Sequence, residues 1–118
     1  MSSRLFQGVV HQMKDTIDRT IGVIDETMST IACSDLGRIG ESCESIGTES
    51  FSIQEAFIRE GYTFKTFGSR PKSEYLLFVE GTDEQAAKYA SLLAISFASI
   101  KQYYDEKYDR SNFVKNVI

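Results

Sequence analysis

The chain has 118 residues, of which 42% are hydrophobic and 25% are charged, a composition typical of one globular domain. Its net charge of −4 disfavours a nucleic-acid-binding surface, which is normally basic. No apolar run reaches the ~18 residues that a membrane span needs. We therefore expect residues 1–118 to form a single domain of a cytoplasmic protein.

The first half of the chain predicts a helix, two strands and a loop. Apolar residues recur at helical spacing near the N-terminus: Leu5, Phe6, Val9, Val10, Met13 and Ile17. Residues 21–24 and 28–33 are short strand-like runs, with a turn expected at 25–27. Residues 34–50, rich in Gly, Ser and Glu, predict a mainly irregular, functional loop with room for one short helical piece.

The second half predicts three strands and a long helix. Residues 51–68 read as a hairpin that turns at Glu60 and Gly61, because glycine supplies the positive φ of such a turn. Residues 75–79 are apolar on both sides, as in a central strand. A helix of up to ~36 residues, capped by Thr82, follows. Its expected packing seam is Ala86, Tyr89, Leu93, Ser96, Ile100 and Tyr103.

This order of elements predicts an α+β fold. We expect a five-stranded, mostly antiparallel sheet flanked by an N-terminal helix and a long C-terminal helix. This is the plan of sensor folds of the PAS, Cache and GAF type, which permits many functions.

Motifs for catalysis and for metal or cofactor binding are missing from the sequence. No glycine is followed by the Lys-Ser or Lys-Thr step of a P-loop. His11 is the only histidine, and Cys33 and Cys43 do not form a Cys-x-x-Cys pair. Glu41 and Glu44 could do acid–base work, although solvated loop acids are the ordinary interpretation. We expect no enzymatic activity, no cofactor and no metal site.

Basic residues on a loop and around the second hairpin are the candidates for binding. Arg38 lies in a glycine-containing loop, and Arg59, Lys65, Arg70 and Lys72 surround the hairpin. Guanidinium groups and free backbone N–H groups bind carboxylates and phosphates well. The alternative is that these bases are solvated and balance nearby acids. It is favoured for Arg59, Arg70 and Lys72 and left open for Arg38 and Lys65.

Three segments resemble known transcription regulators. Residues 31–40 (Ile-Ala-Cys-Ser-Asp-Leu-Gly-Arg-Ile-Gly) resemble the N-terminal sugar-diacid recognition domain of the carbohydrate diacid regulators. Residues 61–65 and 78–94 are similar to the purine-catabolism-type regulators of Gram-positive bacteria. The diacid family has a His-Glu-Gly segment where residues 42–45 read Ser-Cys-Glu-Ser. The resemblance therefore implies an anionic ligand without specifying a sugar diacid.

The resemblance implies a ligand-sensing domain that precedes a DNA-binding helix-turn-helix. Because the sequence stops inside a helical pattern, we expect a chain truncated before that domain, so that DNA is bound only through a part absent here. We expect a small anionic metabolite to be bound by five residues: Ser34, Arg38, Gly40, Tyr62 and Lys65. The closing helix would transmit binding, and a homodimer would form through the first helix and the exposed turns of the last. The alternative is a ligand-free dimerisation or scaffold domain.

Overall fold

The computed structural model describes residues 2–53, 55–68 and 75–117. It confirms the α+β class and the order of the main elements. Arg70, Pro71 and Lys72 lie outside the described residues. The elements are α1 (Ser2–Met13), β1 (Ile21–Asp25), β2 (Thr30–Cys33), the 3₁₀ helices η1 (Leu36–Arg38), η2 (Glu44–Ile46) and η3 (Thr48–Ser52), β3 (Phe57–Arg59), β4 (Tyr62–Phe67), β5 (Tyr75–Glu80) and α2 (Glu84–Val117).

The five strands form one antiparallel sheet in the order β2-β1-β5-β4-β3. The last strand, β5, therefore lies in the middle, as its apolar sequence predicts. Leu77 and Val79 of β5 point into one core, and Leu76 and Phe78 point into the other. The architecture is compatible with a PAS-like fold.

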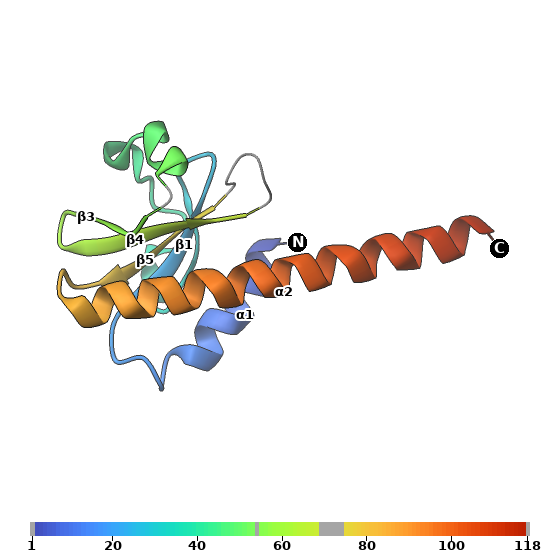
Figure 1. Cartoon of the computed structure of the whole chain (residues 1–118), viewed down its shortest axis with the longest axis horizontal. Helices are drawn as coiled ribbons and strands as arrows, with labels where there is room; N and C mark the ends of the chain where they lie inside the picture. The colour runs from blue at the N-terminus through green and yellow to red at the C-terminus, as the bar shows by residue number, and fades with distance from the viewer. Residues whose placement is uncertain (1, 54, 69–74, 118) are drawn as a thin grey trace.

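The two helices cover one face of the sheet, and residues 34–53 cover the opposite face (Figure 1). We call residues 34–53 the covering segment. Phe6 and Val10 of α1 share a core with Ala90 and Phe97 of α2, and the Phe6 and Phe97 rings meet edge to face, 5.6 Å apart. The smaller core beneath the covering segment consists of Ile24, Met28, Cys33, Ile46, Phe51, Phe64, Leu76 and Phe78.

The long helix α2 differs from the sequence prediction in its cap and its buried face. Its cap is Asp83 and not Thr82, because Asp83 Oδ1 accepts the Ala86 N–H at 3.2 Å. Tyr103, predicted in the packing seam, is exposed. The buried residues of α2 are Ala86, Ala90, Leu93, Ala94 and Phe97. The predicted seam is therefore confirmed at Ala86 and Leu93, and Tyr89 packs against the same core. Ser96 and Ile100 are only half-buried.

Both hairpins are present, and one strand of each is shorter than predicted. In the first, β2 begins at Thr30 and not at Met28, because Met28 has φ 65° and belongs to the turn. In the second, β3 starts only at Phe57. Its turn confirms the prediction: Glu60 and Gly61 have φ of 53° and 85°, both positive as a two-residue type I′ turn requires.

The sheet edge at β2 is closed by groups that the sequence pattern does not reveal. The Gln7 side chain accepts the Cys33 N–H at 2.8 Å and donates to the Cys33 carbonyl at 3.2 Å. Further along, the Gly40 N–H donates to the Thr30 carbonyl at 2.8 Å, and the Thr30 N–H donates to the Glu41 carbonyl at 2.9 Å. The start of the covering segment is thereby fixed along β2. Among the described residues, no helix is long and apolar enough to cross a membrane.

Candidate ligand-binding cavity

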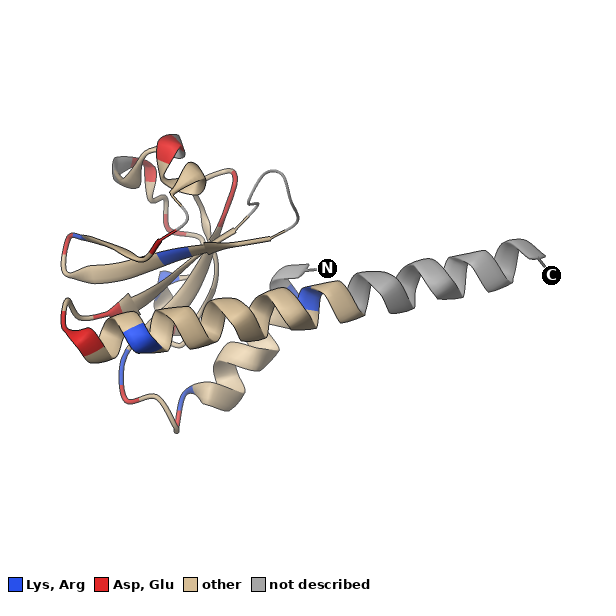
Figure 2. Ribbon diagram, in the orientation of Figure 1, with Lys and Arg blue, Asp and Glu red and all other residues tan. Residues whose placement is uncertain are grey.

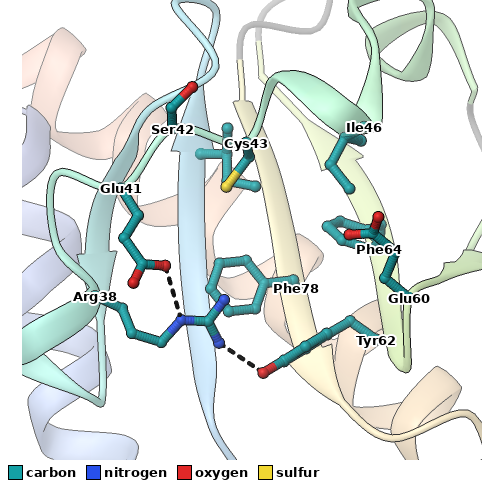
Figure 3. Close-up of a pocket in the computed structure, with 10 residues that line it drawn as sticks. Arg38, Glu41, Ser42, Cys43, Ile46, Glu60, Tyr62, Phe64 and Phe78 are labelled. Carbon is teal, nitrogen blue, oxygen red and sulfur yellow. Dashed lines mark hydrogen bonds and ion pairs between the residues drawn. The ribbon is translucent and has the colours of Figure 1, made fainter.

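A cavity of about 130 Å³ lies between the sheet and the covering segment (Figure 3). Buried apolar side chains form its walls, and the exposed residues Glu41, Ser42 and Glu60 form its rim. The cavity lies on the face of the sheet opposite α1 and α2, so it does not enter the larger core between the sheet and these helices. The lining residues are Ile24, Arg38, Glu41, Ser42, Cys43, Ile46, Glu60, Tyr62, Phe64 and Phe78.

Among the described residues that line the cavity, Arg38 is the only cation. The short helix η1 positions it, because the Asp35 side chain accepts the Gly37 N–H at 3.2 Å and the Asp35 carbonyl accepts the Arg38 N–H at 3.0 Å. Arg38 Nε donates to Glu41 Oε1 at 3.3 Å, and Nη1 donates to the Tyr62 hydroxyl at 2.6 Å. The guanidinium is thus held between two elements that are distant in sequence (Figure 3).

Two aromatic rings support the same guanidinium. Its central carbon lies 5.1 Å from the centroid of Tyr62 and 5.4 Å from that of Phe78, within the range of cation–π contacts. The Arg38 side chain is 27% exposed. Burial acts to lower the pKa of Arg38, but the hydrogen bonds and charges of Glu41 and Tyr62 outweigh it and raise the pKa above its ordinary value. Arg38 is therefore a fixed cation.

The arrangement leaves hydrogen-bond donors available. Tyr62 oxygen accepts from Arg38, so its own O–H proton can be donated to a ligand. Arg38 Nη2 has no hydrogen-bond partner among the described residues. Glu41 holds the guanidinium with one oxygen at 3.3 Å, a long contact compared with a bidentate carboxylate pair. These groups can bind a carboxylate.

Gly22 of β1 makes room for the ring under the guanidinium. A Cβ at this position would overlap the Phe78 ring and lie 2.8 Å from the Ala32 carbonyl oxygen. The missing side chain leaves room for the tip of the Phe78 ring, which meets the Tyr62 ring in a T-shaped contact with centroids 5.5 Å apart. Gly22 therefore helps to determine the depth of the cavity.

Arg59 has a structural role in holding the cavity closed at its far end. Its Nη1 donates to the Ile46 carbonyl at 2.7 Å, which ties the covering segment to the second hairpin. The Ser50 hydroxyl donates to the same carbonyl at 2.9 Å. The Thr66 hydroxyl donates to the Ile53 carbonyl at 2.9 Å. Arg59 was expected to be solvated and to balance nearby acids, whereas the structure pairs it with a backbone carbonyl.

Of the five residues predicted to bind a ligand, the structure brings two together. Arg38 and Tyr62 line the cavity. Ser34 is paired with Ile21, accepting its N–H at 3.0 Å, and lines a separate open depression of about 300 Å³. Gly40 uses its N–H on Thr30. Lys65 neighbours Phe64 in β4, and successive side chains of a strand point to opposite faces, so Lys65 lies on the α2 side.

Other lining residues were not expected from the sequence. The sequence predicts only a turn at Glu60, and this turn brings it to the rim. It predicts only strands at Ile24 and Phe78. The alternation of Tyr62 and Phe64 on one side of β4 was a usable signal, but their neighbours follow only from the sheet order, which pairs β4 with β5 and β5 with β1.

The two cysteines differ in environment. Cys43 is half-buried, lines the cavity, and its Sγ lies 3.4 Å from Thr30 Oγ1. Cys33 is fully buried, and burial raises the pKa of its thiol. Neither is disulfide-bonded. Among the residues described, no group of three His, Cys, Asp or Glu side chains is arranged to hold a metal ion.

Comparison with known proteins gives a fold match. No protein-family model and no curated protein matches the sequence. Among solved structures, the chain is similar to one in the crystal structure of the E. coli DhaR(N)–DhaL complex, with a TM-score of 0.60 and 7% sequence identity. The match covers 98% of this chain and 51% of the other, so this chain spans about half of that protein's length.

Proposed function

We propose that this chain is the small-molecule-sensing domain of a cytoplasmic bacterial transcription regulator, without enzymatic activity. A metabolite that carries a carboxylate occupies the cavity between the sheet and the covering segment. DNA is bound by a different domain, outside this chain. The observation that carries the proposal is the placement of Arg38, a partly buried cation held by Tyr62 and Glu41 at the edge of an otherwise apolar cavity.

The chemistry of the cavity supports a carboxylate ligand. The guanidinium offers an Nη2 without a described partner, and Tyr62 offers an O–H. Figure 3 shows Arg38 and Tyr62 beside each other at one end of the cavity, so one ligand group can reach both. Charge-assisted hydrogen bonds of this kind contribute more than neutral ones, and two parallel bonds fix orientation as well. The walls of Ile24, Ile46 and Phe64 exclude water from the rest of the ligand.

The fold supports a route for signalling. The cavity floor, Phe78, lies on β5, the same strand that packs Leu77 and Val79 against the helices. α2 follows β5 directly and extends far beyond the sheet (Figure 1). Ligand binding shifts α2 only if the two positions of the helix differ in ligand affinity. The fold match to a chain of the DhaR(N)–DhaL complex also supports the association of this chain with a partner protein.

A binding experiment tests the proposed site. Small carboxylates are screened by thermal shift, and hits are titrated by isothermal calorimetry against the wild-type chain. Arg38→Ala should weaken a hit by about tenfold or more, because it removes a charged hydrogen-bond donor. Arg38→Lys should recover only part of this loss, since lysine lacks the planar guanidinium that can donate two parallel hydrogen bonds. Arg4→Ala, which removes an exposed arginine of α1, serves as the matched control. Normal binding by Arg38→Ala would remove Arg38 from the site.

A second candidate function is a ligand-free dimerisation or scaffold domain. A largely apolar stripe on the outer face of α2 favours it: Leu92, Ile95 and Tyr103 are 62%, 66% and 68% exposed. These positions lie on one side of a helix, with the exposed Ser99 between Ile95 and Tyr103. A homodimer is compatible with both candidates. A dimer that persists on dilution, together with a thermal-shift screen without any hit, would favour the scaffold.

A further inference from the structure

The charges around the cavity are those of a receptor for a zwitterion. In the part of the chain that the structure describes, the lining holds one cation, Arg38, and two carboxylates, Glu41 and Glu60. Glu41 already contacts Arg38. Glu60 has no ion-pair or hydrogen-bond partner among the described residues. Figure 3 shows Glu60 and Arg38 on opposite sides of the cavity, so a ligand between them meets a positive group at one end and a negative group at the other.

The same charges disfavour a dianion. One guanidinium can neutralise one carboxylate, and a second negative charge in so small a space would be repelled by Glu41 and Glu60. A positive charge near Glu60 would be attracted instead. Figure 2 shows further acids on the covering segment, where Asp35, Glu44 and Glu49 add to the negative charge, although Arg59 lies beside Glu60 at the tip of the second hairpin.

The enclosed part of the cavity has room for only a few atoms of a ligand. The cavity measures about 130 Å³, whereas a buried apolar cavity of ~150 Å³ accommodates benzene. Alanine has as many non-hydrogen atoms as benzene, and a six-carbon sugar diacid has more than twice as many. A small side chain would contact Ile24, Ile46 and Phe64, the buried walls.

Resting on the function proposed above, we propose that the ligand is a small α-amino acid bound as a zwitterion. Arg38 and Tyr62 hold its carboxylate, and Glu60 accepts hydrogen bonds from its ammonium group. Glu41 keeps its contact with Arg38 Nε and orients the guanidinium toward the carboxylate. The cavity thus discriminates amino acids from simple carboxylates through one residue at the turn between β3 and β4.

The test compares alanine with isobutyrate, in which a methyl group replaces the ammonium group, by isothermal calorimetry on the 118-residue chain. Alanine should bind about two- to fivefold more tightly, the effect of one exposed ion pair. Glu60→Gln should abolish this preference and leave isobutyrate binding unchanged. Glu60→Asn provides a second variant, because asparagine tolerates the positive φ of this position. Glu44→Gln, which removes an exposed acid outside the cavity lining, should keep the preference.

The outcomes separate this inference from the function on which it rests. The six-carbon sugar diacid glucarate is titrated as a third compound. If isobutyrate or glucarate binds at least as tightly as alanine, the amino-acid assignment is overturned and the carboxylate site still stands. A preference for alanine that survives both Glu60 variants would overturn the role of Glu60. Absence of binding by all three compounds to the folded wild-type chain would overturn both the inference and the proposed function.

Discussion

At the scale of single residues, the cavity depends on side chains that are small or missing as well as on Arg38. Gly22 lies on the cavity side of β1, where any Cβ would overlap the Phe78 ring. Because Arg38 stacks on that ring, a change at Gly22 is transmitted to the guanidinium. Packing and binding are therefore coupled through Phe78.

We predict that Gly22→Ala destabilises the chain by about 1–3 kcal/mol, the usual cost of overpacking a core. The Phe78 ring must move into the cavity, so carboxylate binding should weaken as well. Urea unfolding and calorimetry measure the two effects. The matched control is Gly8→Ala in α1, where a Cβ has open space around it. It should stabilise the chain by about 0.5–1 kcal/mol, because alanine is the better helix former. Equal effects of the two substitutions would contradict the packing account.

At the scale of the elements, one carboxylate joins the start of α2 to the segment before β1. Asp83 caps α2 through the Ala86 N–H and also pairs with Arg19, whose Nη2 lies 2.8 Å from Asp83 Oδ2. The Arg19 side chain also donates to the Glu80 carbonyl at 3.3 Å, so it spans the end of β5 as well. The hydrogen bond from Arg19 holds the pKa of Asp83 well below its usual range.

This shift predicts a pH dependence of stability. The folded-state pKa of Asp83 is lower than its unfolded value of about 4. The stabilisation by Asp83 is therefore complete above that value and is lost as the pH falls below it toward the folded pKa. Urea midpoints of wild type and Asp83→Asn should differ most near neutral pH and converge in acid. Glu84→Gln removes a neighbouring exposed carboxylate as the control. A difference that stays constant from neutral pH down to strong acid would contradict the prediction.

The same elements show what the sequence could and could not predict. The central position of β5 was predictable because residues 75–79 are apolar on both sides, and the turn at Gly61 because few other residues adopt its φ. The N-cap of α2 was not predictable, because Thr82 and Asp83 are both good caps. The choice of Asp83 follows from its pairing with Arg19, 64 residues away in sequence. Lys65 was grouped with Tyr62 in the predicted site, but side chains three residues apart in one strand point to opposite faces, so the sequence itself could have separated them.

At the scale of the whole molecule, α2 sets the shape. The longest dimension is 52 Å, close to the ~51 Å of a helix of 34 residues. Only its first part lies along the sheet (Figure 1). Helices in proteins gain most of their stability from packing of one face. We therefore expect a second copy to pack on the exposed stripe of Leu92, Ile95 and Tyr103.

We predict that the chain forms a homodimer at micromolar concentration and that Leu92→Glu combined with Ile95→Glu makes it monomeric, because both substitutions place charge in the interface. Analytical ultracentrifugation measures the change, and circular dichroism verifies the fold. Ser91→Glu adds the same kind of charge about 100° around the helix from Leu92 and should leave the dimer intact. A wild-type chain that sediments as a monomer at every concentration would refute this surface.

The measurement that tests the central claim most directly is the map of amide shifts in ¹⁵N-labelled chain on saturation with a small carboxylate ligand. Binding in the cavity predicts that the largest changes fall at residues 38–46 and 60–64 and at Phe78, which surround Arg38. Changes centred instead on Ser34 and the depression beside it, or on Lys65 and the α2 side of β4, would contradict a ligand site beneath the covering segment.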